Sequence, residues 1–308
     1  MFSAARAFCE HSYRAFQRYR SGDPIGAQVS LYNIYIGLLE KWTRYSPDRT
    51  LLDEEWDVAI ILDACRVDAL RYCASEYDWL TEIEATTSVA GRTPEWMDAT
   101  FQQPAACSSI HYVSGNPYSV SHLDDEWFAE ILHLSEHEWN EQYHTVPAKP
   151  VTDAAIRTWR SAESGSMVVH YMQPHFPSIP SLRGDVPAKS FGRGGIDGRW
   201  ESVRRDEITK VDVVESYLAN LRYVLDEVSV LLQNMDADDV LITADHGTCL
   251  GEYGIYGHAG YHLPKVFSIP LVWTTATDEH TREPDNITVE ASTDQSVEEQ
   301  LAALGYVR

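Results

Sequence analysis

Four apolar runs along the chain predict strands that are buried on both faces. They cover residues 56–63 (WDVAIILD), 167–172, 240–244 and 269–273. Continuous runs of this length are typical of strands in parallel sheets, which helices cover on both sides. The fourth run contains Pro270, which indicates an edge strand or the start of a strand.

Two segments between the apolar runs show helical patterns. Apolar residues at three- and four-residue spacings predict a helix over residues 213–235, and a second helix is expected over residues 65–77. Residues 176–205 are rich in Gly, Pro and Arg, which predicts a long loop of the kind that forms binding lids. The alternation of strands and helices predicts an α/β fold with a central, mostly parallel sheet and helices on both faces.

Residues 1–50 are interpreted as a basic, aromatic N-terminal helical leader, and residues 51–308 as one α/β catalytic domain. Residues 277–295 form a polar, acidic tail, and a short helix is expected over residues 297–304. The apolar stretch at residues 31–39 is too short to cross a bilayer. No transmembrane segment is therefore expected, and membrane association would require a partner.

The charge balance narrows the classes of function. The formal net charge is -23, from 47 acidic and 24 basic residues. Such a surface repels nucleic acid, so no nucleic-acid partner is expected. It is typical of proteins kept soluble in concentrated salt, which indicates a halophilic, archaeal source; the alternative is an ordinary acidic cytosolic protein. An odd number of cysteines, five, without a CxxC pair or a signal peptide, predicts a cytoplasmic location.

Two of the predicted strands end in polar side chains suited to metal binding. Asp63 ends the first run, and Asp245 and His246 follow the third. Because ligands collect at the carboxyl ends of the strands in α/β sheets, these side chains are expected to meet there. Carboxylate and imidazole groups suit Zn²⁺ or Mn²⁺. The alternatives are a helix N-cap at Asp63 and an ordinary turn at Asp245 and His246.

The same segments resemble the sulfatase-type branch of the alkaline-phosphatase superfamily. The matching stretches are Ile61–Asp68, Val113–Pro117, Tyr171–His175, Ile242–Gly247, Leu250–Glu252, Tyr256–His258 and Leu304–Tyr306. The resemblance extends from about Trp56 to Tyr306. It implies the layered fold of that superfamily, with the C-terminal subdomain reduced or absent because the chain after Trp273 is short.

The resemblance also implies a nucleophile in the region after the first Asp. Thr93 is the candidate, because Pro94 suits the first position of a helix and would place Thr93 at the N-cap, where a bound phosphate or sulfate is favoured. A metal could lower the pKa of its hydroxyl. An ordinary capping threonine is the alternative, and Ser88 is the reserve nucleophile.

Two departures separate this chain from true sulfatases. No cysteine lies in the Cys-x-Pro-x-Arg motif of that branch, and Ala64 stands where sulfatases usually carry a second metal-binding Asp. The resemblance is therefore stronger to the threonine-using phosphoester enzymes. It implies one divalent ion (Mn, Zn, Mg or Ca), held by Asp63, Thr93, Asp245 and His246.

Four further residues are candidates for contacts with the substrate. The resemblance gives His175 the role of hydrogen-bonding the substrate or protonating the leaving group, and His258 that of holding an ester oxygen. Arg66 and Arg92 are candidate anion clamps. The alternatives are structural or loop histidines and surface ion pairs.

Three functions follow as hypotheses. The first is a metal-dependent hydrolase or transferase of phosphate esters with Thr93 as nucleophile, acting on an ester that a glycan or a lipid-linked glycan could carry. The second is a sulfatase of sulfated glycans. The third is an inactive family member with a binding role in glycan assembly.

Overall fold

The structure is a computed structural model. It describes residues 50–179, 208–252, 254–258, 262–285 and 296–304, together with residues 13, 16, 17, 19–22, 47 and 203. Most of the predicted loop at residues 176–205 lies outside the described residues, and so does most of the predicted leader. The domain boundary at residue 50 stays a prediction.

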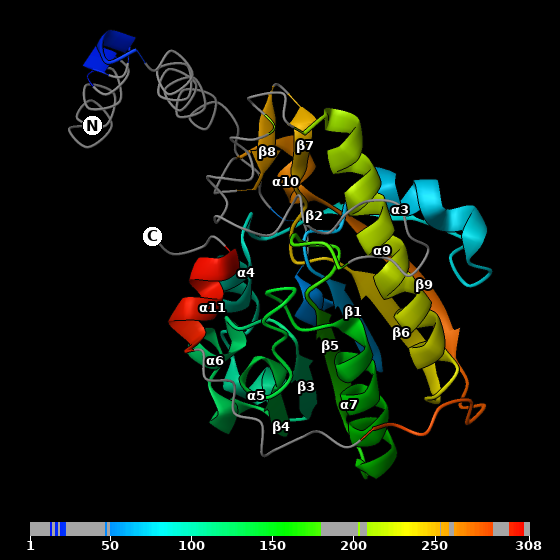
Figure 1. Ribbon diagram of the computed structural model, residues 1–308. Helices are drawn as coiled ribbons and strands as arrows, with labels where there is room; N and C mark the ends of the chain where they lie inside the picture. The colour runs from blue at the N-terminus through cyan, green and yellow to red at the C-terminus, as the bar shows by residue number, and fades with distance from the viewer. Residues whose placement is uncertain are drawn as a thin grey trace.

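The described core alternates strands and helices from residue 51 onward (Figure 1). The strands are β1 (Val58–Leu62), β2 (Glu84–Thr87), β3 (Ile110–Ser114), β4 (Glu130–His133), β5 (Ser166–Tyr171), β6 (Ala237–Thr243), β7 (Cys249–Glu252), β8 (Ile255–Gly257) and β9 (Ser268–Ala276). The α-helices are α3 (Val67–Cys73), α4 (Thr93–Thr100), α5 (Pro104–Cys107), α6 (Ser119–His122), α7 (Ala148–Ser161), α9 (Lys210–Leu232), α10 (Pro264–Phe267) and α11 (Val297–Leu304). The short 3₁₀ turns are η1 (Leu51–Asp53), η2 (Ala74–Glu76), η3 (Asp125–Trp127) and η4 (Leu134–Glu136).

Seven strands form one sheet in the order β2-β9-β6-β1-β5-β3-β4. β1 pairs in parallel with β5 and β6, and β3 pairs in parallel with β4 and β5. β9 is antiparallel to both β6 and β2. The sheet is therefore mostly parallel, as the sequence predicts, and the carboxyl ends of β1, β5 and β6 lie at one edge.

Both faces of the sheet are covered, which explains the continuous apolar runs. In β1, Ile60 and Leu62 belong to one apolar cluster, with α3, α7 and α9. Ile61 belongs to a second cluster on the other face, with Trp96 and Met97 of α4. All of β1 is fully buried. The expected α/β fold with helices on both faces is confirmed.

Several boundaries differ from the sequence prediction. α9 begins at Lys210, earlier than expected, because Thr209 and Asp212 form a capping box. β9 lies between β2 and β6 and is not an edge strand; Pro270 is near its start. β2, β3 and β4 were not predicted, because they are short: β2 and β4 have no buried position, and β3 is a five-residue segment that includes His111 and Ser114.

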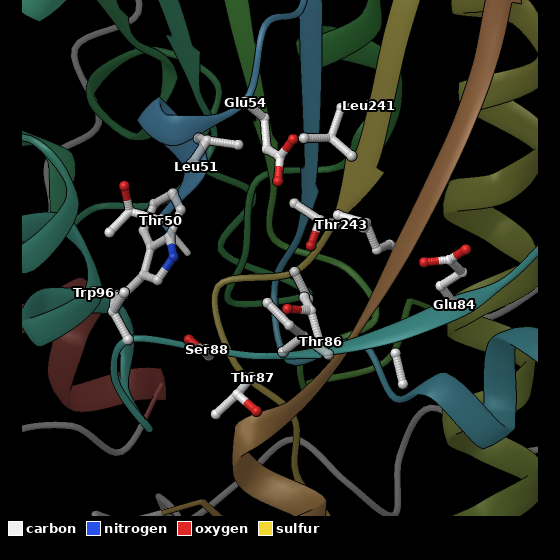
Figure 2. A pocket seen from close by; sticks show the side chains of 15 residues that line it. Thr50, Leu51, Glu54, Glu84, Thr86, Thr87, Ser88, Trp96, Leu241 and Thr243 are labelled. Carbon is white, nitrogen blue, oxygen red and sulfur yellow. The ribbon is translucent and has the colours of Figure 1, made fainter. Parts of the chain in front are cut away.

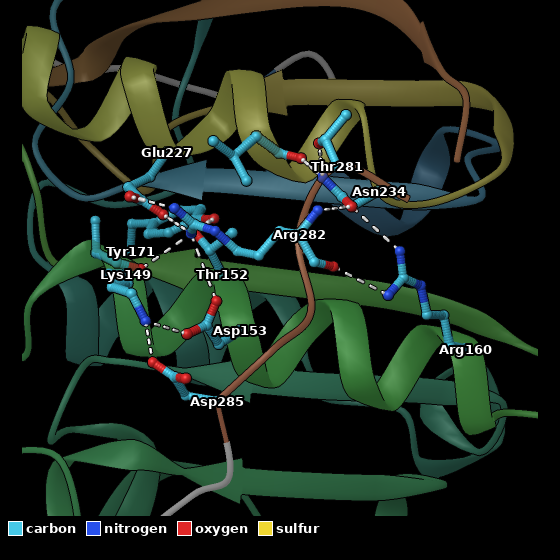
Figure 3. Close-up of polar contacts among 12 residues, drawn as sticks. Lys149, Thr152, Asp153, Arg160, Tyr171, Glu227, Asn234, Thr281, Arg282 and Asp285 are labelled. Atoms are coloured by element: carbon cyan, nitrogen blue, oxygen red, sulfur yellow. Dashed lines mark hydrogen bonds and ion pairs between the residues drawn. The ribbon is translucent and has the colours of Figure 1, made fainter. Parts of the chain in front are cut away.

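The chain after β9 returns across the helices as a C-terminal strap, defined here as residues 277–285 (Figure 3). Arg160 of α7 forms an ion pair with Asp278 at 2.7 Å. Arg282 of the strap reaches Glu227 of α9 at 2.6 Å and Asp153 of α7 at 3.5 Å. The strap thus ties together the two helices that cover one face of the sheet.

None of the helices that the structure describes has both the length and the apolar character needed to cross a membrane.

Candidate metal centre

The candidate site is formed where two neighbouring strands end. Asp63 directly follows β1, and its backbone N–H donates to the carbonyl of Tyr171 in β5 at 3.1 Å. Asp245 lies two residues after β6, the other neighbour of β1. The N–H of Ala64 donates to Asp245 Oδ1 at 3.1 Å, which joins the two strand ends. The helix after β1 begins at Val67, so Asp63 is not its N-cap.

Asp63, Asp245 and His246 come together as a buried cluster. It is the one group of three or more His, Cys, Asp or Glu side chains among the described residues whose ligand atoms lie within 4.8 Å of one another. All three side chains are fully buried. The His246 Nε2 atom lies 3.6 Å from Asp63 Oδ1 and 3.3 Å from Asp245 Oδ2. The strand-end prediction thus places these residues correctly.

These spacings match a single small cation. Ligands that surround a tetrahedral ion at about 2.0–2.1 Å lie roughly 3.3 Å from one another. The Thr93 hydroxyl lies beside the cluster and could supply a fourth oxygen, since its Oγ1 is 2.7 Å from Asp245 Oδ2 and 3.3 Å from His246 Nε2. Asp63 Oδ1 is buried and makes no hydrogen bond. Buried polar atoms are nearly always satisfied, so this oxygen is suited to a metal.

His246 is oriented and charged as a metal ligand requires. Its Nδ1 lies 2.9 Å from the carbonyl oxygen of Gly247, to which it donates, so Nε2 carries the lone pair that faces the carboxylates. Burial above all, and the nearby charge of Arg92, lower the pKa of His246 to about 4. The ring is therefore neutral near pH 7, which is the form that binds metals.

Burial and mutual repulsion make the ionised forms of the Asp63 and Asp245 carboxylates unfavourable. Burial raises the pKa of Asp63, and the charge of Asp245 raises it further. Burial also raises the pKa of Asp245. A divalent cation would remove this penalty, because an opposite charge within a few ångströms favours the ionised form. Both the donor set and its electrostatics fit one such ion.

Asn116 holds Asp63 in place, a role that the sequence analysis missed. Its Nδ2 donates to Asp63 Oδ2 at 2.8 Å, which leaves Oδ1 for the cluster. Its own Oδ1 accepts the N–H of Tyr118 at 2.9 Å, and its backbone N–H donates to Ser114. Asn116 lies in one of the stretches that carry the sequence resemblance, but nothing in the sequence links it to Asp63.

Thr93 lies at the start of α4 with its hydroxyl turned to the cluster. The sequence predicts Thr93 at the N-cap, whereas Arg92 is the N-cap and Thr93 is the first helical residue. The difference is one residue, and its cause is the hydroxyl, which donates to Asp245 and leaves the helix amides uncapped. Thr93 is completely buried.

Ser88, the reserve nucleophile, is held differently. Its hydroxyl donates to the main-chain carbonyl of Asp245 and accepts the N–H of Ala90. It therefore contacts the backbone of a candidate ligand, whereas Thr93 contacts the ligand's carboxylate. This geometry favours Thr93 over Ser88.

His175 and His258 form a pair beside the cluster. Their Nε2 atoms are 3.0 Å apart, and the ring of His258 stacks on that of His246 at 4.1 Å between centroids. Burial, followed by the proximity of His246, holds the pKa of His258 well below its usual value. His258 is therefore neutral near pH 7, and a single proton is shared between the two Nε2 atoms.

The two arginines differ in what they can bind. Arg66 is buried, and its guanidinium forms ion pairs with Asp68 at 2.7 Å and Glu252 at 2.8 Å. It also donates to the carbonyl of Thr248, so it braces the loop after Asp245. Arg92 is about half exposed and pairs with Glu95, one turn further along α4. Its positive charge contributes to the lowered pKa values of both His246 and His258.

No protein-family model matches the chain, and no curated protein does. Solved structures with similarity include the soluble domain of lipooligosaccharide phosphoethanolamine transferase A from Neisseria meningitidis, with 13% identity, a TM-score of 0.46, and 81% of this chain and 86% of that chain covered. A second is the C-terminal periplasmic domain of EcEptC from Escherichia coli in complex with Zn, with 11% identity, a TM-score of 0.41 and coverage of 85% and 86%. A third is a 2-O GAG sulfatase, with 10% identity, a TM-score of 0.47 and coverage of 72% and 64%. The solved structures that the chain is similar to are thus phosphoethanolamine transferases and sulfatases, at low identity.

Proposed function

We propose that this protein is a metal-dependent enzyme that hydrolyses or transfers a phosphate ester, with Thr93 as its nucleophile. One observation carries the proposal: the Thr93 hydroxyl lies 2.7 Å from Asp245 Oδ2 inside a fully buried cluster of metal-ligand type. A threonine that only capped a helix would direct its oxygen to the helix amides.

Asp63, Asp245, His246 and Thr93 would hold the divalent ion. When bound, the ion supplies positive charge that favours the alkoxide form of Thr93 and the developing charge on the ester. Asn116 fixes the orientation of Asp63, and the carbonyl of Gly247 fixes that of His246.

The first half of the reaction forms a bond from Thr93 Oγ1 to phosphorus and breaks the bond from phosphorus to the leaving oxygen. The hydroxyl proton moves to Asp245 Oδ2, its hydrogen-bond partner. His175 gives its Nε2 proton to the departing oxygen, and neutral His258 accepts a hydrogen bond from that proton in the resting pair. The product of this half is a phosphorylated Thr93 and a free alcohol.

The second half releases the group. Water or an acceptor alcohol attacks the phosphorus and returns a proton to His175 Nε2, and Thr93 leaves with the proton held on Asp245. Arg92, which directly precedes Thr93 and is about half exposed, is the candidate clamp for a non-bridging oxygen, together with His258. Arg66, with its guanidinium bound to two carboxylates, acts on the substrate only through the loop that it braces.

The test is hydrolysis of bis-p-nitrophenyl phosphate in concentrated potassium chloride, by protein that has been chelated and then supplied with manganese or zinc. Thr93→Ala is expected to lower kcat by at least about a thousandfold, as the loss of a nucleophile does. Ser88→Ala is the matched control and keeps most of the activity. Loss in Ser88→Ala with retention in Thr93→Ala would assign the nucleophile to Ser88.

Two further measurements distinguish the sulfatase hypothesis and the inactive-protein hypothesis from this proposal. Turnover of an aryl sulfate in preference to the phosphodiester would identify a sulfatase. Failure to bind either metal, together with no turnover of either ester, would identify an inactive binding protein.

A further inference from the structure

A cavity lies on the face of the sheet that carries α4, beside the Asp63, Asp245 and His246 cluster. Its volume is about 340 Å³, and residues of η1, β2, β6, α4 and β9 line it. Figure 2 shows Glu54 at one end, Thr87 and Ser88 at the other, and Trp96 and Glu84 on opposite sides. No role in the proposed reaction accounts for this cavity.

Many of the polar groups of the cavity are hydrogen-bond acceptors, while the hydroxyls of Thr86 and Thr87 and the indole N–H of Trp96 can also donate. The Thr50 hydroxyl donates to Asp53, the Ser88 hydroxyl to the carbonyl of Asp245, and the Thr243 hydroxyl to the carbonyl of Pro270. Each of these hydroxyls donates its proton to another oxygen of the protein. Towards a ligand it can therefore act only as an acceptor. Glu54 and Glu84 add two carboxylates, which also accept.

The charge of the lining excludes anionic ligands. None of the fifteen lining residues is Lys, Arg or His, while two are Glu. A phosphate or sulfate placed here would meet carboxylates and acceptor oxygens without a cation. A ligand that brings hydrogen-bond donors to the two carboxylates and carries no negative charge therefore suits this lining.

A metal ion is also a poor fit. Glu54 and Glu84 lie on different sides of the cavity (Figure 2). Neither belongs to the Asp63 cluster, and the described part of the chain offers no other group of metal-ligand side chains at binding distance. A compact ion could not contact both carboxylates, whereas a ring with hydroxyl groups around its edge could.

The cavity is connected to the candidate site through two elements. Its floor includes Thr243 and Ala244, which directly precede Asp245. Its wall includes Trp96, which follows Thr93 by one helical turn. A ligand in the cavity therefore touches the elements that position the nucleophile and one carboxylate.

We propose that this cavity binds one sugar residue, either uncharged or bearing an amine. Hydroxyl and ammonium groups supply the donors that the lining requires, and Trp96, Leu241 and Leu271 supply apolar walls for the carbon face of the ring. The volume lies at the lower end of the roughly 300–1,000 Å³ typical of small-molecule sites, which suits one ring. The assignment of this sugar to the substrate rests on the proposed function; the binding itself does not.

The test measures binding by saturation-transfer NMR, without turnover. Glucosamine and glucose are the probes, and glucuronate and glucose 6-phosphate are the anionic comparisons. Glucosamine and glucose should show saturable binding, and the anions should not. Glu54→Gln and Thr86→Val should each weaken glucosamine binding about tenfold, as expected for one charge-assisted or neutral hydrogen bond.

Matched controls lie next to the altered residues. Glu55 and Glu82 are exposed and do not line the cavity, so Glu55→Gln and Glu82→Gln should bind glucosamine like the wild type. No saturation by glucosamine or glucose, equal binding of the anions, or unchanged binding in both Glu54→Gln and Thr86→Val would overturn the proposal. Hydrolysis of bis-p-nitrophenyl phosphate, measured on the same variants, separates this outcome from a failure of the proposed function.

Discussion

Single side chains next to the metal cluster decide how its ligands point. Asp63 has two carboxylate oxygens, and only one of them faces His246. The other is held by the Asn116 amide, which is itself fixed at both ends. An outer partner of this kind contributes to metal binding without touching the metal.

Removal of the Asn116 amide should therefore weaken metal binding. We expect Asn116→Ala to lower metal affinity by about 10–100-fold, the usual cost of losing such a partner. Titration calorimetry on chelated protein measures it directly. Asn140→Ala removes an amide that also caps a turn, but one that does not contact Asp63, and it should keep the wild-type metal affinity. Equal affinities in the two variants would contradict the role of Asn116.

A second residue-scale prediction concerns His170 in β5. Burial lowers its pKa from 6.5 to about 4, and the charge of Asp245 opposes this shift only partly. As the pH falls below about 6.5, the unfolded chain takes up a proton at this residue while the folded chain does not. The free energy of unfolding should therefore fall between about pH 6.5 and pH 4, by on the order of 3 kcal/mol.

Denaturant unfolding of chelated protein across this pH range measures the effect. His170→Gln cannot titrate, so its pH dependence should be flatter than that of the wild type. His280→Gln alters a residue whose side chain is 76% exposed and should leave the pH dependence unchanged. An identical slope in the wild type and His170→Gln would contradict the prediction.

The sequence locates the candidate metal ligands better than the residues around them. Asp63, Asp245 and His246 could be placed because each follows an apolar run, and parallel strand ends share an edge. Asn116 and Ser88 act through contacts between segments far apart in the chain, which no local pattern encodes. For Arg66 the sequence shows the charge but not the two carboxylates that surround it.

At the scale of elements, the loop after β6 is held by a close approach of two backbones. A Cβ atom on Gly247 would lie 2.2 Å from the carbonyl oxygen of Lys265, in the short helix α10. The Gly247 N–H also donates to the carbonyl of Val266 at 2.6 Å. Only glycine allows the segment that carries His246 to lie this close to α10.

Gly247→Ala should separate these two segments and displace His246. We expect loss of metal binding and a decrease of several kcal/mol in the free energy of unfolding, since overpacking against backbone typically costs about 1–3 kcal/mol or more. Gly115→Ala is the comparison, because its Cβ would meet the Val151 side chain at 3.1 Å and that side chain can shift. Metal titration and denaturant unfolding of both variants measure these effects. Similar losses of metal affinity and unfolding free energy in Gly247→Ala and Gly115→Ala would contradict the role of the close contact at Gly247.

The sequence predicted the helices and strands whose apolar pattern is long and regular. β1 and β6 are apolar on both faces, and α9 keeps its apolar stripe over several turns. β2 has an exposed half, and its pairing is set by β9, a strand from the other end of the chain. Such a short segment becomes a strand only through its tertiary contacts.

At the scale of the whole molecule, the C-terminal strap holds α7 and α9 together through buried charge. Asp153 is only 3% exposed and depends on Arg282 and Lys149 for compensation. Removing one partner of a buried pair is costly, because it leaves the other charge in a poorly solvated place.

Arg282→Ala should therefore lower the free energy of unfolding by about 3–5 kcal/mol. Arg222→Ala removes an arginine from the more exposed pair with Glu76 and should cost no more than about 1 kcal/mol. Denaturant titration of both variants measures the difference. A cost for Arg282→Ala as small as that for Arg222→Ala would show that the strap does not depend on this buried pair.

The pairing of β2 with β9 bears on when the site can form during synthesis. Thr87 of β2 pairs with Ser268 of β9, and Ser88 donates its N–H to the carbonyl of Phe267. The segment that leads into Thr93 therefore has no strand partner until the ribosome has made β9. Asp63 can settle beside β5, which ends at Tyr171, well before β9 has been made. The nascent protein can thus place Asp63 before the segment that leads into Thr93, and the candidate site is completed only when β9 joins the sheet.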